Sequence, residues 1–215
     1  MKFHLLLILL LCSSLTKAQQ LINEAPSPVE LNIGNNRFGL QFLMNKHFAP
    51  ASKFSFLSVT SYESTYNNDV NNLDFINNSQ VSFEIYKGFG IATGLSVNRV
   101  AGLTPIVGLE YVFVNKKMLI VVTPTYHLSK NKNMEGLTLI EYKPKLSEKI
   151  NLYSRFQALY NLNYKNNTHE RSYMQIRLGI GIGSYQFGVA SNFDYYGPTK
   201  VYKDNYGLFF RHSFK

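Results

Sequence analysis

The last residues of the chain carry the pattern that most limits how it can fold. In the segment 206–214, Tyr206, Leu208, Phe210, His212 and Phe214 alternate with Gly207, Phe209, Arg211 and Ser213. Successive side chains of a β-strand point to opposite faces, so a strand here has one largely aromatic face and one small or charged face. The pattern predicts a strand that separates an apolar environment from a polar one.

The same alternation recurs through most of the chain, and no segment has a convincing helical period. The expected strands are 29–33, 37–45, 53–63, 81–86, 89–98, 107–113, 118–127, 138–145, 151–163, 174–183, 185–195 and 206–214. Short turns are expected near residues 50, 87, 116, 148 and 184, and longer polar loops at 66–79, 129–136, 165–171 and 197–205. Regular alternation of short turns and longer loops is typical of an up-and-down barrel in a membrane.

The terminal segment resembles the last strand of Gram-negative outer-membrane β-barrels, in which alternating apolar residues and a final aromatic residue form an insertion signal. Tyr206, Leu208, Phe210 and Phe214 carry the resemblance, and Lys215 after them departs from the pattern. The resemblance implies a closed, antiparallel, up-and-down transmembrane β-barrel, and the expected strands number about twelve, with ten as the alternative. It also implies a monomer in the cell outer membrane, with lipid, lipopolysaccharide and the barrel-assembly machinery as partners.

A secreted soluble barrel is the alternative, and it would bury its apolar face inward. The polar faces of the expected strands combine glycines with charged residues, which suits a crowded, hydrated lumen. Tyrosines near the expected strand ends would form an interfacial belt; these are Tyr126, Tyr160, Tyr164, Tyr185, Tyr195 and Tyr206. These features favour the membrane barrel.

Residues 1–18 have the features of a secretory signal, with Lys2 before the apolar run 5–11 and Ala18 at the expected cleavage site. Cys12 offers a lipoprotein alternative, but the bulky Leu11 precedes it where a small residue is expected. Residues 19–28 are expected to be a periplasmic lead, and 29–215 the barrel. Without the signal the chain has no cysteine, which excludes disulfides and thiolate metal sites.

The chain is basic, with a formal net charge of +9 that falls to +7 without Lys2 and Lys17. This charge favours solubility or attraction to anionic lipids and solutes, and the scattered basic residues argue against nucleic acid. The expected lumen-lining residues are Arg155, Arg177, Arg211, Lys143 and Lys145, balanced by Glu110, Glu141 and Asp194.

The predicted function is a narrow porin-like channel or binding barrel for small polar or anionic solutes. A barrel filled by its own side chains, structural or adhesive with functional loops, is the alternative.

One further arrangement suggests a lipid-modifying hydrolase. His127 and Ser129 lie two residues apart, and Glu141 on the next expected strand would orient the imidazole. The pair is similar to the His-x-Ser pair of outer-membrane lipid A deacylases, although Lys130 stands where that family usually has Asn. The alternation also directs His127 into the lumen, away from lipid. No metal-ligand spacing is present, no cofactor is expected, and the pattern favours a protein without enzymatic activity.

Overall fold

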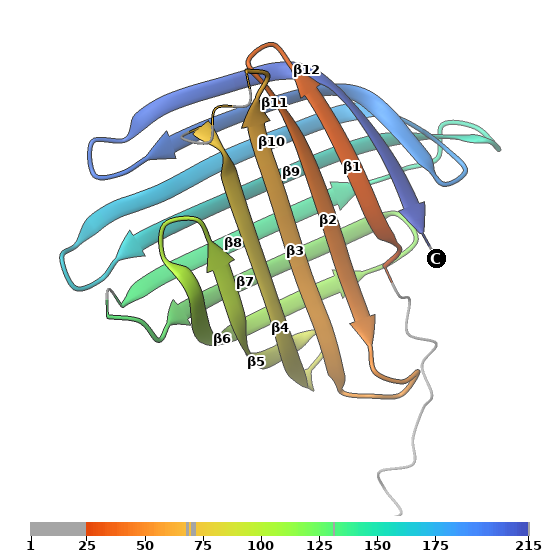
Figure 1. Cartoon of the computed structure of the whole chain (residues 1–215). Coiled ribbons are helices and arrows are strands. Elements are labelled where there is room, and N and C mark those ends of the chain that lie inside the picture. The colour runs from red at the N-terminus through yellow and green to blue at the C-terminus, as the bar shows by residue number, and fades with distance from the viewer. Residues whose placement is uncertain (1–24, 68, 70–71, 131, 215) are drawn as a thin grey trace, which may run out of the picture.

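The computed structural model describes residues 25–67, 69, 72–130 and 132–214. The expected signal segment 1–18 and residues 19–24 of the expected lead lie outside the described residues. The described chain is a closed barrel of twelve antiparallel strands (Figure 1), which confirms the predicted fold and strand number. The strands are β1 (Ser27–Gly34), β2 (Arg37–His47), β3 (Phe54–Thr65), β4 (Asp74–Tyr86), β5 (Phe89–Asn98), β6 (Gly102–Val114), β7 (Met118–His127), β8 (Asn133–Tyr142), β9 (Ile150–Asn163), β10 (Thr168–Ile182), β11 (Tyr185–Tyr196) and β12 (Val201–Phe214).

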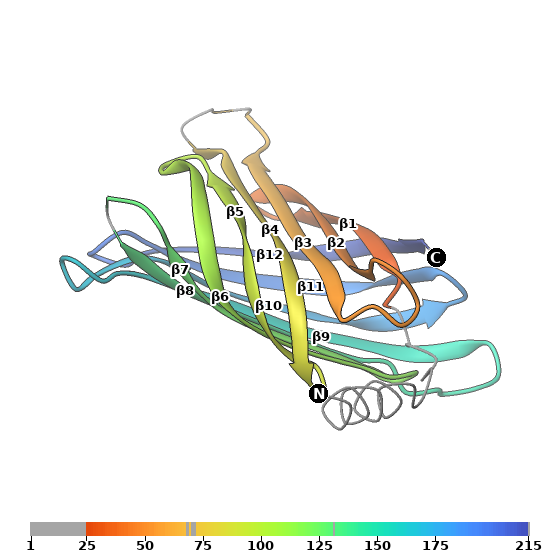
Figure 2. The ribbon, with the colours of Figure 1, turned by 90° about the horizontal axis from the view of Figure 1, so that it is seen from below.

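The first and last strands close the barrel. β1 pairs with β12 from Ser27 opposite Phe214 to Gly34 opposite Gly207. Figures 1 and 2 show the strands as one tilted wall, with the end of β12 beside β1. We call the end where β1 begins and β12 ends the terminal end, and the opposite end, where the β3–β4 and β7–β8 connections lie, the loop end.

The outer face of the wall is mainly apolar and the inner face carries the charged residues, as a membrane barrel requires. Most outward-facing residues are apolar and at least partly exposed, as with Leu40, Phe83, Ile91, Leu178 and Leu208. The inward positions hold the buried charged residues, including Arg211 and Glu141, which are 1% and 0% exposed. A soluble barrel would have the reverse arrangement. Among the described residues, no helix is long and apolar enough to cross a membrane.

The interior is filled with side chains. An apolar cluster occupies one part of it: Leu43, Leu57, Val59, Leu119, Val121, Leu137, Leu139, Leu159 and Tyr173. Buried charged and amide side chains occupy much of the rest, and they come from β1–β4, β6 and β8–β12. The expected hydrated lumen is therefore replaced, at mid-height, by packed side chains, as a barrel of this small size permits.

Several strands are longer at the loop end than the alternation predicts. β4, β8, β10 and β12 begin at Asp74, Asn133, Thr168 and Val201, all inside segments expected to be loops. The backbone ladder continues there although polar residues such as Asn77, Glu135 and Lys203 interrupt the alternation, because strands that leave the lipid no longer need a continuous apolar outer face. The loops are correspondingly shorter, and the β1–β2 connection at this end is only the residues 35–36.

Candidate functional site

A row of paired charges follows the polar wall of the interior from one end of the barrel to the other. We call it the ionic ladder. Five of the chain's six arginines and five carboxylates form it: Arg37, Arg155, Arg171, Arg177 and Arg211 with Glu30, Glu63, Asp74, Glu141 and Asp194. Each of these side chains points inward because it occupies an inward position of the alternating pattern.

At the terminal end, Glu141 is the first carboxylate of the ladder. It accepts a hydrogen bond from Lys143 Nζ at 3.0 Å and pairs with Arg211 at 2.5 Å. The Tyr153 hydroxyl contacts both Glu141 and Arg211. Arg155 is the direct cross-strand neighbour of Glu141, and it leads to the next carboxylate.

Glu30 is the central carboxylate of the ladder. Its Oε1 accepts hydrogen bonds from Arg155 Nη2 and Arg177 Nε, each at 2.8 Å. Arg177 also donates to Asn192 Oδ1 at 2.7 Å, and Asn192 donates to Glu63 Oε1 at 2.9 Å. The amide of Asn192 therefore connects the central carboxylate group to the loop-end half.

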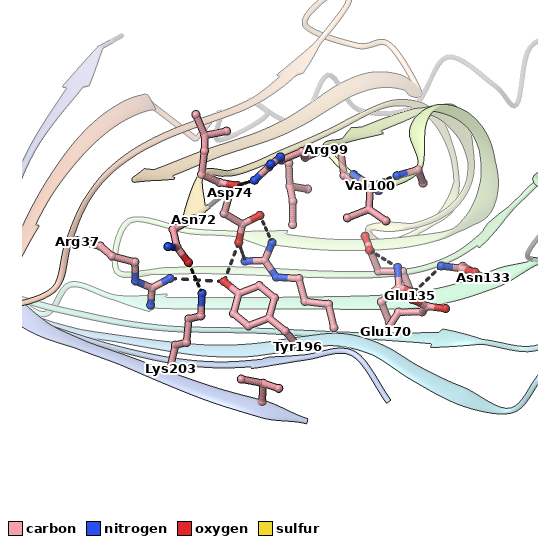
Figure 3. Close-up of a pocket in the computed structure, with 17 residues that line it drawn as sticks. Arg37, Asn72, Asp74, Arg99, Val100, Asn133, Glu135, Glu170, Tyr196 and Lys203 are labelled. Atoms are coloured by element: carbon pink, nitrogen blue, oxygen red, sulfur yellow. Dashed lines mark hydrogen bonds and ion pairs between the residues drawn. The ribbon is translucent and has the colours of Figure 1, made fainter. Parts of the chain in front are cut away.

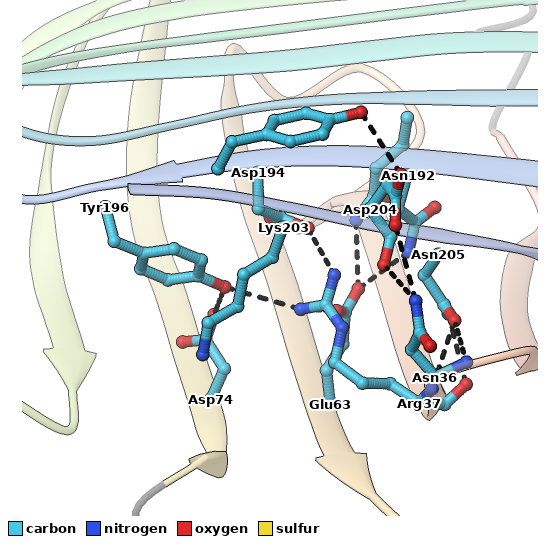
Figure 4. A network of polar contacts seen from close by, with 12 residues as sticks. Asn36, Arg37, Glu63, Asp74, Asn192, Asp194, Tyr196, Lys203, Asp204 and Asn205 are labelled. Atoms are coloured by element: carbon cyan, nitrogen blue, oxygen red, sulfur yellow. Dashed lines mark hydrogen bonds and ion pairs between the residues drawn. The ribbon is translucent and has the colours of Figure 1, made fainter. Parts of the chain in front are cut away.

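Figure 4 shows Arg37, Glu63 and Asp194 in the loop-end half of the ladder, with Asp74 beside Tyr196. Arg37 lies between Glu63 and Asp194, with nitrogen–oxygen distances of 2.8 and 2.7 Å. Arg171 pairs with Asp74 at 2.5 Å and approaches Asp194 at 3.5 Å. The Tyr196 hydroxyl also donates to Asp74, at 2.8 Å. The ladder is thus continuous with the surface of the loop-end cavity.

A cavity lies at each end of the ladder. The loop-end cavity has a volume of about 620 Å³ and is lined by Arg37, Arg171, Tyr196 and Lys203, with Asn133 and Glu135 among its other lining residues (Figure 3). The terminal-end cavity has a volume of about 430 Å³, and four lysines line it: Lys116, Lys117, Lys143 and Lys145. Between them, a void of about 10 Å³ lies beside Glu30, Glu63 and Arg177. That volume is at the lower limit for one water molecule.

The structure brings most of the expected lumen-lining residues together. Arg155, Arg177, Arg211, Glu141 and Asp194 are all in the ladder. Lys143 and Lys145 line the terminal-end cavity instead of the middle of the barrel.

Glu110 is separate from the ladder. It faces inward from β6 and accepts hydrogen bonds from Ser82 Oγ at 2.6 Å and Gln80 Nε2 at 2.7 Å. Of the expected insertion signal, Tyr206, Leu208, Phe210 and Phe214 are all exposed on the outer wall.

The expected His127–Ser129–Glu141 arrangement is not formed. Antiparallel pairing places Glu141 opposite Leu119, eight residues from His127, or about 26 Å along the strand. The carboxylate nearest to His127 is Glu135, with Nε2 and Oε2 4.0 Å apart. His127 faces inward and is buried, as the alternation predicts. Because β8 turns back from the loop, it carries Glu141 to the terminal end.

Half of the ladder was not predicted from the sequence. Glu30 and Arg37 occupy inward positions of expected strands, so the alternation was sufficient to predict that their side chains face the interior. Glu63 lies in the expected strand 53–63, whose faces the sequence does not separate. Asp74 and Arg171 lie in segments expected to be loops, where the sequence gives no facing direction.

These features define the class of protein. A lipid-exposed sheet edge leaves backbone groups without partners, so only a closed sheet can cross the hydrocarbon layer. This barrel is closed, has an even number of strands, and presents apolar residues outward around an ionic interior. The protein is an outer-membrane β-barrel.

Comparison with known proteins gives similar solved structures, whereas no protein-family model and no curated protein sequence matches the chain. A KdgM porin is 11% identical, with a TM-score of 0.47 over 88% of this chain and 99% of that one. The NanC porin is 10% identical, with a TM-score of 0.49 over 89% and 99%. OccK5 (OpdH) of Pseudomonas aeruginosa is 9% identical, with a TM-score of 0.40 over 81% and 66%. At this level of similarity, function has to be argued from the residues of this chain.

Proposed function

We propose that this outer-membrane barrel is a narrow porin-like channel that binds small anionic solutes and passes them along the ionic ladder. The ladder itself carries the proposal, because it joins two end cavities that both contain basic side chains. Charges on low-dielectric walls concentrate the field inside a cleft and raise the local concentration of oppositely charged solutes.

The chemistry of the ladder suits carboxylate or phosphate solutes. An arginine side chain presents several N–H donors in a planar fork that matches such oxyanions. In the structure each ladder arginine is already paired with an internal carboxylate. A passing anion would exchange with these carboxylates one after another, so that no arginine is left buried without a partner.

The void beside Glu30 sets the expected conductance. At about 10 Å³, it admits a solute only when the neighbouring side chains of the ladder move. We therefore expect a small single-channel conductance with a preference for anions. A wide, water-filled pore would be inconsistent with the packed interior.

Planar bilayer recordings of the purified protein test this proposal. Arg177→Gln and Arg155→Gln each remove one cation from the constriction, and we expect each to lower the ratio of anion to cation permeability by about threefold to tenfold, because the local potential falls. Arg155→Glu and Arg177→Glu should reverse the preference if the barrel still folds. Lys165→Gln is the matched control, because Lys165 is exposed in the β9–β10 connection.

A correctly folded barrel that carries no current would overturn the channel and favour the alternative of a filled structural barrel. Selectivity unchanged by the ladder variants would overturn the role of the arginines. Folding of each variant is checked by its resistance to SDS at low temperature, so that a folded variant without current is distinguished from one that does not fold.

A further inference from the structure

The β9–β10 pair contains a bulge at the loop end. Leu162 is opposite His169, Asn161 is opposite Arg171, and Tyr160 is opposite Ser172, so the strand has one extra residue, Glu170. In a regular strand His169 and Ser172 would face opposite sides, because they are three residues apart. The extra residue puts both on the face of Leu162 and Tyr160. Tyr160 is 48% exposed, so this is the outer wall of the barrel.

On that face, His169 and Ser172 form a hydrogen-bonded pair. The Nε2 atom of His169 lies 2.9 Å from Ser172 Oγ, and its Nδ1 atom lies 2.7 Å from the carbonyl oxygen of Gly197. A carbonyl oxygen only accepts hydrogen bonds, so Nδ1 carries the proton in this contact. In neutral imidazole Nε2 is then the acceptor, and the Ser172 hydroxyl donates to it.

This polarity is the one that a nucleophile and its general base require. A serine hydroxyl that donates to an imidazole nitrogen is activated when that nitrogen takes its proton, and a third group on the other nitrogen holds the ring. Here the third group is the backbone carbonyl of Gly197, on the β11–β12 turn. The same turn is fixed to the bulge, because Gly197 N donates to the Glu170 carbonyl oxygen at 2.8 Å. The imidazole also packs on the Tyr160 ring, with centroids 5.5 Å apart.

The position of the pair on the wall indicates a substrate. Ser172 is the direct cross-strand neighbour of Tyr160 on β9 and Tyr195 on β11. The Tyr195 ring lies 5.2 Å from that of Tyr202, so tyrosines surround the pair. Tyrosines concentrate at the level of lipid headgroups, and Met174 and Phe193 continue the apolar wall below them. Ester bonds of lipids lie at the boundary between headgroups and acyl chains, and these tyrosines indicate that level for Ser172.

We propose that His169 and Ser172 form a lipid-ester hydrolase site on the outer wall of the barrel. Ser172 Oγ bonds to the carbonyl carbon of a fatty-acyl ester while its proton passes to His169 Nε2. The carbon–oxygen ester bond then breaks, and Nε2 returns the proton to the leaving alkoxide. Water adds to the acyl-serine and gives a proton to Nε2. Release of the fatty acid returns that proton to Ser172 Oγ.

This site is separate from the ionic ladder. The ladder side chains face the interior, whereas His169 and Ser172 face outward across the same strands. It also differs from the expected His127–Ser129 arrangement, because His127 faces the interior. A barrel that carries no current would therefore say nothing against the hydrolase site, and a barrel without hydrolase activity would say nothing against the channel.

A fluorophosphonate probe tests the nucleophile in the full-length protein, folded in lipid vesicles. We expect the probe to label Ser172, identified by peptide mass spectrometry, and His169→Gln to slow labelling by about 100-fold or more, as for the loss of a general base. Ser172→Ala should abolish labelling. Ser191→Ala is the matched control, because Ser191 faces outward on β11 opposite Ile176. Labelling elsewhere, or labelling that survives His169→Gln, would overturn the proposal.

The lipid is identified in two parallel reactions. Vesicles of phosphatidylethanolamine and vesicles that contain lipopolysaccharide both present fatty-acyl esters, and mass spectrometry measures the free fatty acid. Release from either one that Ser172→Ala abolishes supports the site and names its source of ester. A folded, SDS-resistant barrel that releases fatty acid from neither lipid would show that the pair is not a lipid hydrolase.

Discussion

Glu30 shows how one residue holds a buried group of charges. The residue is 2% exposed, and its carboxylate receives hydrogen bonds from two arginines that lie on different strands, Arg155 on β9 and Arg177 on β10. Moving a charge out of water costs several kcal/mol, and attraction between partners offsets that cost only while each partner is present. The two guanidiniums therefore depend on Glu30 both for charge balance and for their distance from each other.

The residue-scale prediction concerns the variant Glu30→Gln. It leaves two buried guanidinium groups next to a neutral amide, and we expect the free energy of unfolding to fall by about 3–5 kcal/mol. Urea-dependent folding into detergent micelles measures the change. The chain has no tryptophan, so far-ultraviolet circular dichroism and gel mobility are the suitable signals.

Glu148→Gln is the matched control for this measurement. Glu148 is exposed in the β8–β9 turn, so its replacement should change stability by less than about 0.5 kcal/mol. If Glu30→Gln were as stable as this control, the pairing of Glu30 with its two arginines would contribute nothing to the stability of the fold.

Among the elements, the β4–β5 hairpin depends most clearly on the residue types in its turn. Its connection is only Lys87 and Gly88, and both have positive φ, 43° and 86°. Two-residue turns with this backbone match the twist of the flanking strands, and they favour residues without a Cβ at the second position. The Lys87–Gly88 turn was predicted from the sequence, and the structure confirms it.

At the scale of this element, we expect Gly88→Val to destabilise the hairpin. A Cβ at Gly88 would clash with the backbone carbonyl of Val112, and a β-branched residue at this φ adds strain. The expected loss of stability is about 1–3 kcal/mol or more. Gly136→Val on β8 is the control, because a Cβ there meets nothing within 4 Å. Equal stability of the two variants, measured by urea-dependent folding, would contradict this account.

The whole molecule depends on the pairing of β1 with β12. This pair joins the two ends of the described chain and leaves no sheet edge in the wall. Opening it in a bilayer would expose unpaired N–H and C=O groups, each at a cost of several kcal/mol. Insertion of all twelve strands therefore requires closure. Loss of the β1–β12 pairing should prevent insertion of the whole barrel, and not only destabilise one strand.

Deletion of residues 206–214 tests closure at this scale. We expect the truncated protein to fail to insert, because β1 loses all of its pairing with β12 and β11 loses it from Tyr185 to Ser191. Full-length protein should appear in the membrane fraction as an SDS-resistant band, and the truncated protein should not. A truncated protein that fractionated with membranes and resisted SDS like the full-length chain would disprove the requirement.

The sequence by itself determined the strands and the faces on which their side chains lie. Alternation is a local property, so each strand could be predicted from its own residues, as β10 and β12 show. The predicted loop-end starts of these strands were wrong because polar residues on both faces interrupt the alternation there, as with His169 and Arg171 on β10 and Asp204 and Lys203 on β12. The apolar side chains that fill the interior, such as Leu139 and Val121, were also not anticipated.

Only the tertiary structure decided which face meets lipid and which charges meet. Glu30 and Arg177 are 147 residues apart in sequence, and no local pattern could pair them. Antiparallel register likewise moved Glu141 away from His127, and a single bulge brought His169 and Ser172 to one face. The physical reason is the same in each case. The direction of a side chain follows from its own strand, whereas the side chain that it contacts depends on the closure of the barrel and on the register of its strands, which involve the whole chain.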